Sequence, residues 1–157
     1  MNPETREKLM SVSVATLCSA LYKRGLKNQT IQDVRPVRAK GRNMVGPAFT
    51  LRYMPTREDR NPMTVFRDPK HPQRHAIETC PEGYVLVMDS RKDARAASAG
   101  DILITRLMVR GGAGVVPDGG FRDAMTIGGA DMPAYHNPPS SPTNLPLYVP
   151  LAVHVPV

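Results

Sequence analysis

The chain of 157 residues contains no tryptophan, only 5 Tyr and 3 Phe, and only 2 Cys. With so few rings, stacking platforms for nucleic-acid bases are scarce, and we expect a core of Val, Ile, Leu, Met and Ala. Cys18 and Cys80 stand alone, without a Cys-x-x-Cys motif or zinc-finger spacing. Neither a disulfide framework nor a structural zinc site is therefore predicted, and both residues are expected to be reduced thiols.

Long apolar runs are also missing. The longest are of the kind at 85–88, far short of the ~20 residues that a helix needs to cross a bilayer. The N-terminus carries Glu4 and Glu7 where a signal peptide needs basic and then apolar residues. We therefore expect a cytoplasmic protein without a membrane segment.

Basic residues outnumber acidic ones, 21 to 14, which gives a formal charge of +7. Much of the excess lies in a proline-rich loop at 55–75, where Glu58 and Asp59 interrupt the positive charge. Such a pattern is typical of a solvated loop and argues against nucleic-acid binding. Hydrophobic residues make up 41% of the chain, which together with its length predicts a single globular domain over 1–157.

The expected elements alternate as in an α/β protein. Apolar spacing and end signals predict helices at 11–24, 75–79 and 101–110, and strands at 31–37, 48–53, 84–88 and 113–116. A basic turn is expected at 38–42. Residues 133–157 are proline-rich and are expected to form an extended tail, in which 149–155 alternate as an edge strand does.

Two neighbouring motifs could carry chemistry. In the first, Gly100-Asp101-Ile102-Leu103, a helix opens directly after a glycine, so its free backbone N–H groups could bind a carboxylate or phosphate. In the second, 118–123, Arg122 stands beside Asp123 just beyond a glycine turn at the end of a buried strand. Arginine supplies donors for an oxyanion, and aspartate supplies a hard oxygen for Mg²⁺ or Mn²⁺. We predict that both motifs face one pocket.

Purely structural interpretations stay open beside this one. Asp101 could be only a helix N-cap, and Arg122 and Asp123 only a surface ion pair. Other motifs are weaker: 112–117 lacks the third glycine of a dinucleotide fingerprint, and His71 and His75 flank a proline in a loop-like segment. No Gly-x-Ser-x-Gly motif and no Cys/His pairing indicates covalent catalysis.

The motifs at 46–51, 100–103, 111–116, 118–119 and 122–123 together resemble the RraA-like family. That family unites the regulator of ribonuclease E activity with 4-hydroxy-4-methyl-2-oxoglutarate aldolase and oxaloacetate decarboxylases. The resemblance begins near Val14, although Ser19 stands where the family's first helix commonly has Asp. Family members usually continue past a stretch like 155–157 into further strands, so we expect a C-terminally shortened chain that self-associates and would be stabilised by extension.

The resemblance implies a compact β/β/α sandwich of the phosphohistidine-swivelling-domain type, assembled as a trimer or hexamer with active sites between subunits. It implies a metal-dependent aldolase or oxaloacetate decarboxylase that cleaves 4-carboxy-2-keto acids through a pyruvate enolate. Asp123 would then anchor Mg²⁺ or Mn²⁺, and Arg122 would bind the keto or leaving-group oxygen. The Gly100–Leu103 turn would hold the substrate carboxylate, and Asp101 would orient a water. The alternative is a non-catalytic regulator that binds a ribonuclease or another protein.

Overall fold

The computed structural model describes residues 1–38, 43–57, 59 and 61–157. Its elements, in chain order, are α1 (Pro3–Met10), α2 (Val14–Lys23), β1 (Arg35–Pro36), β2 (Ala48–Pro55), the 3₁₀ helix η2 (Met63–Arg67), α3 (Pro72–Thr79), β3 (Val85–Asp89), β4 (Ala97–Ala99), α4 (Asp101–Val109), β5 (Gly114–Pro117), β6 (Gly120–Phe121), α5 (Ala124–Gly129), β7 (Tyr135–His136) and β8 (Tyr148–Val153). The predicted α/β class is confirmed.

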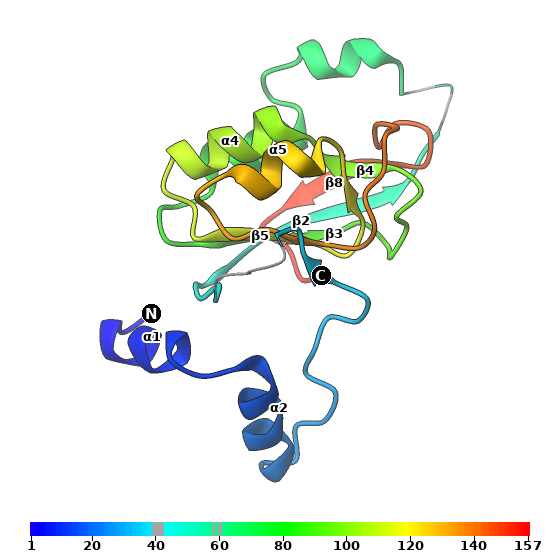
Figure 1. The fold of residues 1–157 in the computed structure, drawn as a ribbon. Helices are drawn as coiled ribbons and strands as arrows, with labels where there is room; N and C mark the ends of the chain where they lie inside the picture. The colour runs from blue at the N-terminus through cyan, green and yellow to red at the C-terminus, as the bar shows by residue number, and fades with distance from the viewer. Residues whose placement is uncertain (39–42, 58, 60) are drawn as a thin grey trace.

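The main sheet has four strands in the order β5-β3-β2-β8. β2, β3 and β5 are parallel, and β8 joins the edge antiparallel to β2. Two short sheets complete the body, an antiparallel β1–β7 pair and a parallel β4–β6 pair. Helices α4 and α5 lie together over the sheets (Figure 1). The edge strand expected within the proline-rich tail is therefore present as β8.

The two central strands have the burial that their sequences predict. In β2, Phe49, Leu51 and Tyr53 are buried and alternate with more exposed neighbours, as in a strand with one apolar face. β3 is an apolar run that is mostly buried, because it lies between two parallel neighbours. The expected Val, Ile, Leu, Met and Ala residues make up most of the core, but the expectation was incomplete: four aromatic side chains, Phe49, Tyr53, Phe121 and Tyr148, are also in the core.

Buried tyrosines are tolerated because their hydroxyls have acceptors. The Tyr53 hydroxyl donates to the Ser98 carbonyl at 2.8 Å, and the Tyr148 hydroxyl donates to the Ala96 carbonyl at 2.5 Å. The two rings meet edge to face, with centroids 5.2 Å apart. Tyr53 thus joins the main sheet to β4, and Tyr148 joins it to the residue before β4.

The N-terminal 35 residues differ from the sequence expectation. The helix expected at 11–24 is α2, capped by Ser13 and ended by Gly25 at φ +82°, but a separate helix, α1, precedes it. The strand expected at 31–37 is only the two-residue β1. Residues 39–42 of the expected basic turn lie outside the described residues.

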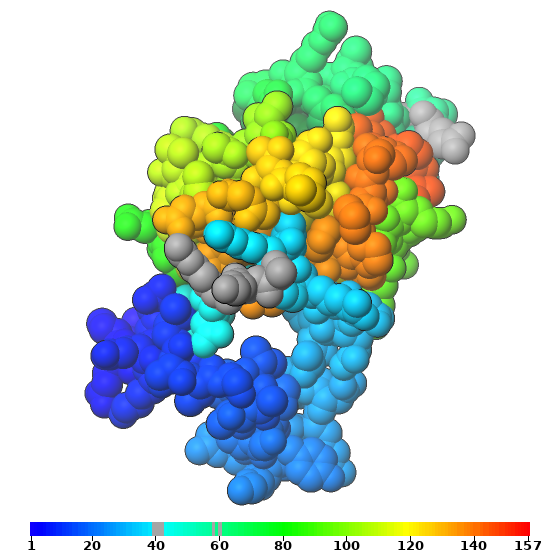
Figure 2. Space-filling model, in the orientation of Figure 1, coloured from blue at the N-terminus to red at the C-terminus, as the bar shows by residue number. Residues whose placement is uncertain are grey.

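The apolar face of α2, formed by Val14, Leu17, Cys18 and Leu21, is at most partly buried. No residue of α1 or α2 is buried, and Val14 is 60% exposed. Figures 1 and 2 show both helices standing away from the sheets as an arm. Hydrogen bonds from the Asn43 amide to the carbonyls of Met10 and Val12 link the arm to the body.

Short elements were missed in the second half of the chain. β4, β6 and α5 were not predicted, because strands of two or three residues and a helix of six are too short to show a period. The helix expected at 75–79 begins earlier, at Pro72, which takes the first helical position where its missing N–H is harmless. Within the 55–75 loop, Glu58 and Arg60 lie outside the described residues.

None of the helices in the described ranges has the length and apolarity that crossing a membrane requires. Both cysteines are free thiols, as expected. Burial raises the pKa of the Cys80 thiol to about 11, so this thiol is not activated as a nucleophile.

Two buried histidines predict sensitivity to mild acid. Burial lowers the pKa of His71 and of His136, and neither Nδ1 has a hydrogen-bond partner among the described residues. The unfolded chain takes up protons below about pH 6.5 while the folded imidazoles stay neutral, so the free energy of unfolding falls as the pH drops through that value.

Thermal melts at pH 7.5 and 5.5 measure this loss. His136 stacks on Phe121 at 5.5 Å, so His136→Phe keeps the ring contact and is expected to reduce the difference between the two melts. The matched change at the exposed His75, His75→Phe, is expected to leave the difference in melting temperature between the two pH values unchanged. Equal acid sensitivity in all three proteins would contradict this explanation.

Candidate functional site

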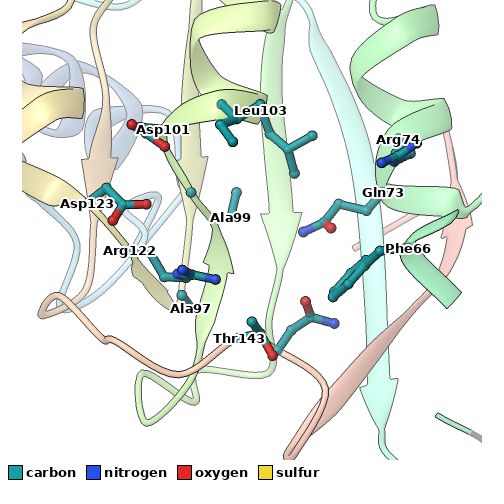
Figure 3. Close-up of a pocket in the computed structure, with 13 residues that line it drawn as sticks. Phe66, Gln73, Arg74, Ala97, Ala99, Asp101, Leu103, Arg122, Asp123 and Thr143 are labelled. Atoms are coloured by element: carbon teal, nitrogen blue, oxygen red, sulfur yellow. The ribbon is translucent and has the colours of Figure 1, made fainter. Parts of the chain in front are cut away.

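A cavity of about 480 Å³ opens between the start of α4, the end of β6 and α3 (Figure 3). Its walls include all the residues predicted for the site: Gly100, Asp101, Ile102, Leu103, Arg122 and Asp123. β4 and β6 are paired in parallel, so the residues that follow the two strands emerge at the same edge. The two predicted motifs thus line one cavity, and the roles of their residues stay predictions.

The first motif forms the N-terminus of α4. Gly100 is the N-cap, in an extended conformation and with no side-chain capping bond, and Asp101 is the first helical residue. The amides of Ile102 and Leu103 donate no hydrogen bond within the described residues. The interpretation of Asp101 as the N-cap was therefore wrong, and the helix presents free N–H groups to the cavity.

The second motif follows β6. The Arg122 amide donates to the Ala99 carbonyl at 3.0 Å, which fixes the backbone of Arg122 beside β4. Asp123 has a left-handed backbone, at φ 54°, that few residues other than glycine, Asn and Asp adopt readily. This conformation turns the chain into α5 and directs the Asp123 carboxylate toward Gly100, as Figure 3 and the packing at Gly100 show.

Arg122 and Asp123 are not a surface ion pair. In the part of the chain that the structure describes, neither side chain makes an ion pair or hydrogen bond, and the same holds for the Asp101 carboxylate. Arg122 and Asp123 are both exposed. Three charged groups thus converge on one cavity with no intramolecular partner among the described residues, an arrangement typical of a ligand site.

Asp118 of the second motif has a structural role. Its carboxylate accepts hydrogen bonds from the amides of Ser90 (2.6 Å) and Lys92 (3.0 Å), which hold the loop after β3. Burial raises the pKa of Asp118, although both hydrogen bonds act in the opposite direction. A side chain at Gly119 would meet the Ser98 hydroxyl at 2.7 Å, so only glycine fits there. In the 118–123 motif, Asp118 and Gly119 therefore stabilise the loop after β3, whereas Arg122 and Asp123 line the cavity.

Sequence reasoning missed the opposite wall. Phe66, Gln73, Arg74, Thr143 and Asn144 also line the cavity. Gln73 and Arg74 lie in the first turn of α3, within the segment interpreted as a solvated basic loop. The available signal was Pro72, which is typical of a first helical turn and would have placed both residues on a helix.

The donor set fits a hard divalent cation better than zinc. Asp101 and Asp123 supply carboxylate oxygens, and the described residues contain no group of three or more His, Cys, Asp or Glu arranged to hold a metal. Mg²⁺ and Mn²⁺ are commonly bound by one or two carboxylates, with waters and substrate oxygens completing the shell. Asp123, whose carboxylate lies against the open backbone of Gly100, is the better placed of the two.

Gly100 is predicted to be essential for the site but not for the fold. A methyl group there would approach the Asp123 Oδ2 atom to 3.0 Å. The carboxylate is the end of a flexible side chain, so Gly100→Ala is expected to displace it without lowering the melting temperature. Mg²⁺ affinity, measured by calorimetry, is expected to fall.

The matched control is Gly129→Ala, because a Cβ at Gly129 meets nothing within 4 Å. This variant is expected to bind Mg²⁺ as the wild type does. Unchanged Mg²⁺ binding in Gly100→Ala would show that the displaced carboxylate is not a metal ligand.

Comparison with known proteins agrees with this architecture. The RraA-like family model, described as Aldolase/RraA, matches residues 14–148. Streptomyces coelicolor RraAS2, an unusual member of the RNase ES inhibitor RraA protein family, is 28% identical and aligns over 100% of this chain and 74% of its own, with a TM-score of 0.85.

Two more distant structures show the same fold. An uncharacterized protein from Pseudomonas syringae pv. tomato is 21% identical, with a TM-score of 0.82 over 100% of this chain and 66% of its own. The RNA-processing inhibitor RraA from Thermus thermophilis is 23% identical, with a TM-score of 0.63 over 94% of this chain and 79% of its own. The family model covers most of the chain and the fold agrees, so this protein belongs to the RraA-like family of aldolase and RraA proteins.

Proposed function

We propose that this protein is a divalent-metal-dependent lyase that cleaves 4-carboxy-2-keto acids and releases pyruvate. The observation that carries the proposal is the convergence of Asp101, Arg122 and Asp123, all without partners among the described residues, at the free N-terminus of α4. A protein that acted only by surface complementarity would not need three unpaired charges around a cavity. The family includes aldolases, which agrees with this proposal.

The barrier to this reaction is the negative charge that develops when the C3–C4 bond breaks and its electron pair stays on C3. Free amides of Ile102 and Leu103 would hold the substrate carboxylate at the positive end of α4. The Arg122 guanidinium would donate to the keto oxygen, where the enolate charge accumulates. Both sets of donors are present before substrate arrives, so little reorganisation is needed during the reaction.

The carboxylates have separate tasks in this proposal. Asp101 would orient a water that carries the proton to C3 of the pyruvate enolate. Asp123 would hold Mg²⁺ or Mn²⁺, which when bound supplies Lewis-acid stabilisation of the enolate charge. Aldol cleavage and oxaloacetate decarboxylation share this enolate, so one site could perform both.

A pyruvate-release assay tests the proposal. Wild-type protein with Mg²⁺ or Mn²⁺ is given oxaloacetate, 4-hydroxy-2-oxoglutarate and 4-hydroxy-4-methyl-2-oxoglutarate, and pyruvate is measured with a coupled dehydrogenase. Because free metal ions decarboxylate oxaloacetate, each rate is compared with a blank that contains metal alone. We expect pyruvate above the blank from at least one acid, and none from any acid would refute the lyase.

The second candidate is a regulator that binds a ribonuclease and catalyses nothing. The likeness to RraAS2, a member of an RNase ES inhibitor family, favours it. Inhibition of RNA cleavage by a ribonuclease of the E type, unchanged in Arg122→Ala and in Asp123→Asn, would support this candidate. Loss of pyruvate release in the same variants would support the lyase, so the two proposals separate.

We further propose that the chain works as a homo-oligomer, a trimer or hexamer. Large apolar side chains are exposed on α4 and α5: Val109 is 70% exposed and Met125 is 92% exposed. Apolar surface of this kind favours self-association. Sedimentation is expected to show an oligomer for the wild type and a smaller species for Met125→Lys, and a monomeric wild type would contradict the proposal.

A further inference from the structure

The wall of the cavity opposite Arg122 is formed by the first turn of α3. Gln73 and Arg74 lie across the cavity from Asp101, Arg122 and Asp123 (Figure 3). The acidic side chains of the cavity are therefore on one side and Arg74 is on the other. A ligand that spans the cavity meets a cation at each end.

Buried hydrogen bonds fix the position of this wall. Gln73 is only 4% exposed, and its Nε2 donates to the Ser98 carbonyl at 2.5 Å and to the Tyr53 hydroxyl at 3.1 Å. Ser98 lies in β4, the strand that leads directly to Gly100. Buried hydrogen bonds therefore link the start of α3 to the strand that leads into α4, and so link the two walls of the cavity.

Arg74 lacks the partner that its helix would normally provide. Glu78 lies four residues later, a spacing at which Arg and Glu side chains can pair. The Glu78 carboxylate instead accepts two hydrogen bonds from Arg106, both 2.8 Å long, and lies 3.5 Å from Arg110. In the described part of the chain, Arg74 consequently makes no ion pair, although it is exposed at the cavity.

We propose that Arg74 is a specificity-determining residue that binds the distal carboxylate of a dianionic 2-keto acid, while the Arg122 side of the cavity holds the keto-acid end. The planar guanidinium can engage both oxygens of a carboxylate. This inference rests on the proposed function, because it assigns one end of the same substrate.

The chemistry predicts which kinetic constant Arg74 affects. In 4-hydroxy-2-oxoglutarate the C3–C4 bond breaks, its electrons form the pyruvate enolate, the C4 hydroxyl loses a proton to become an aldehyde, and C3 gains a proton. The distal carboxylate leaves unchanged on glyoxylate. Since its charge is the same in ground state and transition state, Arg74 should lower KM more than it raises kcat.

Two substrates of equal length isolate this contact. Both 4-hydroxy-2-oxoglutarate and 4-hydroxy-2-oxopentanoate release pyruvate, but the second has a methyl group in place of the distal carboxylate. Arg74→Ala is expected to reduce kcat/KM for the diacid about tenfold or more, mainly through KM, and to change the monoacid less than about twofold. Arg24 is the C-cap of α2, in the arm that stands away from the sheets (Figure 1). Arg24→Ala removes the same charge there and is expected to affect neither substrate. An equal loss for both substrates overturns the proposal and leaves the lyase standing.

The binding of compounds that cannot be cleaved tests, without any turnover, whether Arg74 binds the distal carboxylate. By calorimetry, the wild type is expected to bind 2-oxoglutarate about tenfold more tightly than 2-oxopentanoate, and Arg74→Ala is expected to remove that difference. If neither hydroxy acid is cleaved, the proposed lyase activity on this substrate class is wrong. Calorimetry still tests whether Arg74 binds the distal carboxylate. Binding of 2-oxoglutarate no tighter than 2-oxopentanoate, or no binding of either, overturns the assignment of Arg74.

Discussion

Arg122→Lys is expected to lose most of the pyruvate-releasing activity although the positive charge is kept. The guanidinium is planar and can donate to two oxygens at once, whereas an ammonium group acts as a point charge. By analogy with the removal of one oxyanion donor, the change should cost about 2–4 kcal/mol of transition-state stabilisation, or roughly 30- to 1000-fold in kcat/KM. Because Arg122 is exposed and unpaired within the described residues, the melting temperature should not change.

The control for this variant is Arg95→Lys. Arg95 is also exposed and donates to the Asp93 carboxylate through two nitrogens, at 3.0 and 2.7 Å, on the surface. It does not line the cavity, so its replacement is expected to leave kcat/KM unchanged. Near-normal kcat/KM in Arg122→Lys would show that Arg122 does not contact the reacting atoms.

Asp123→Asn is expected to abolish metal-supported turnover while the protein remains folded. Asn tolerates the left-handed backbone at φ 54° as Asp does, so the free energy of unfolding should change by less than about 0.5 kcal/mol. The lost charge removes the proposed metal ligand, and kcat should fall by at least about 100-fold, as for loss of a major electrostatic contact in the transition state.

Asp33 provides a matched control for this second variant. It is likewise an exposed Asp with a left-handed backbone, at φ 62°, but it lies in the N-terminal segment and does not line the cavity. Asp33→Asn should therefore preserve both stability and activity. A large loss of stability in Asp123→Asn would mean that the carboxylate supports the fold, and undiminished turnover would exclude it as a metal ligand.

Much of the site could be predicted because its residues are close in sequence to strong local signals. Gly100 marks the start of α4, and the glycines at 119 and 120 mark the turn before Arg122. The parallel pair of β4 and β6, which brings the two motifs together, was not itself predicted, but the position of the second motif beyond a strand end was. The residues of this wall could therefore be named from local glycine and helix-start signals, without the strand pair that joins them.

The opposite wall and the N-terminal arm could not be predicted, because their positions depend on contacts between distant parts of the chain. Gln73 is held by Ser98 and Tyr53, 25 and 20 residues away, and no periodic pattern encodes such contacts. The apolar spacing predicted α2 as a helix, yet Leu17, Cys18 and Leu21 on its apolar face are only partly buried. Amphipathic spacing shows that a face is apolar but not what it packs against.

Pyruvate release by metal-free protein, before and after Mg²⁺ is restored, tests the central claim most directly. The chelated protein is given 4-hydroxy-2-oxoglutarate, whose cleavage follows the same pyruvate enolate. We predict no turnover above the protein-free blank without metal, recovery with Mg²⁺ or Mn²⁺, and no recovery in Asp123→Asn. Turnover that is unaffected by the chelator would contradict the metal-dependent enolate site at Asp101, Arg122 and Asp123.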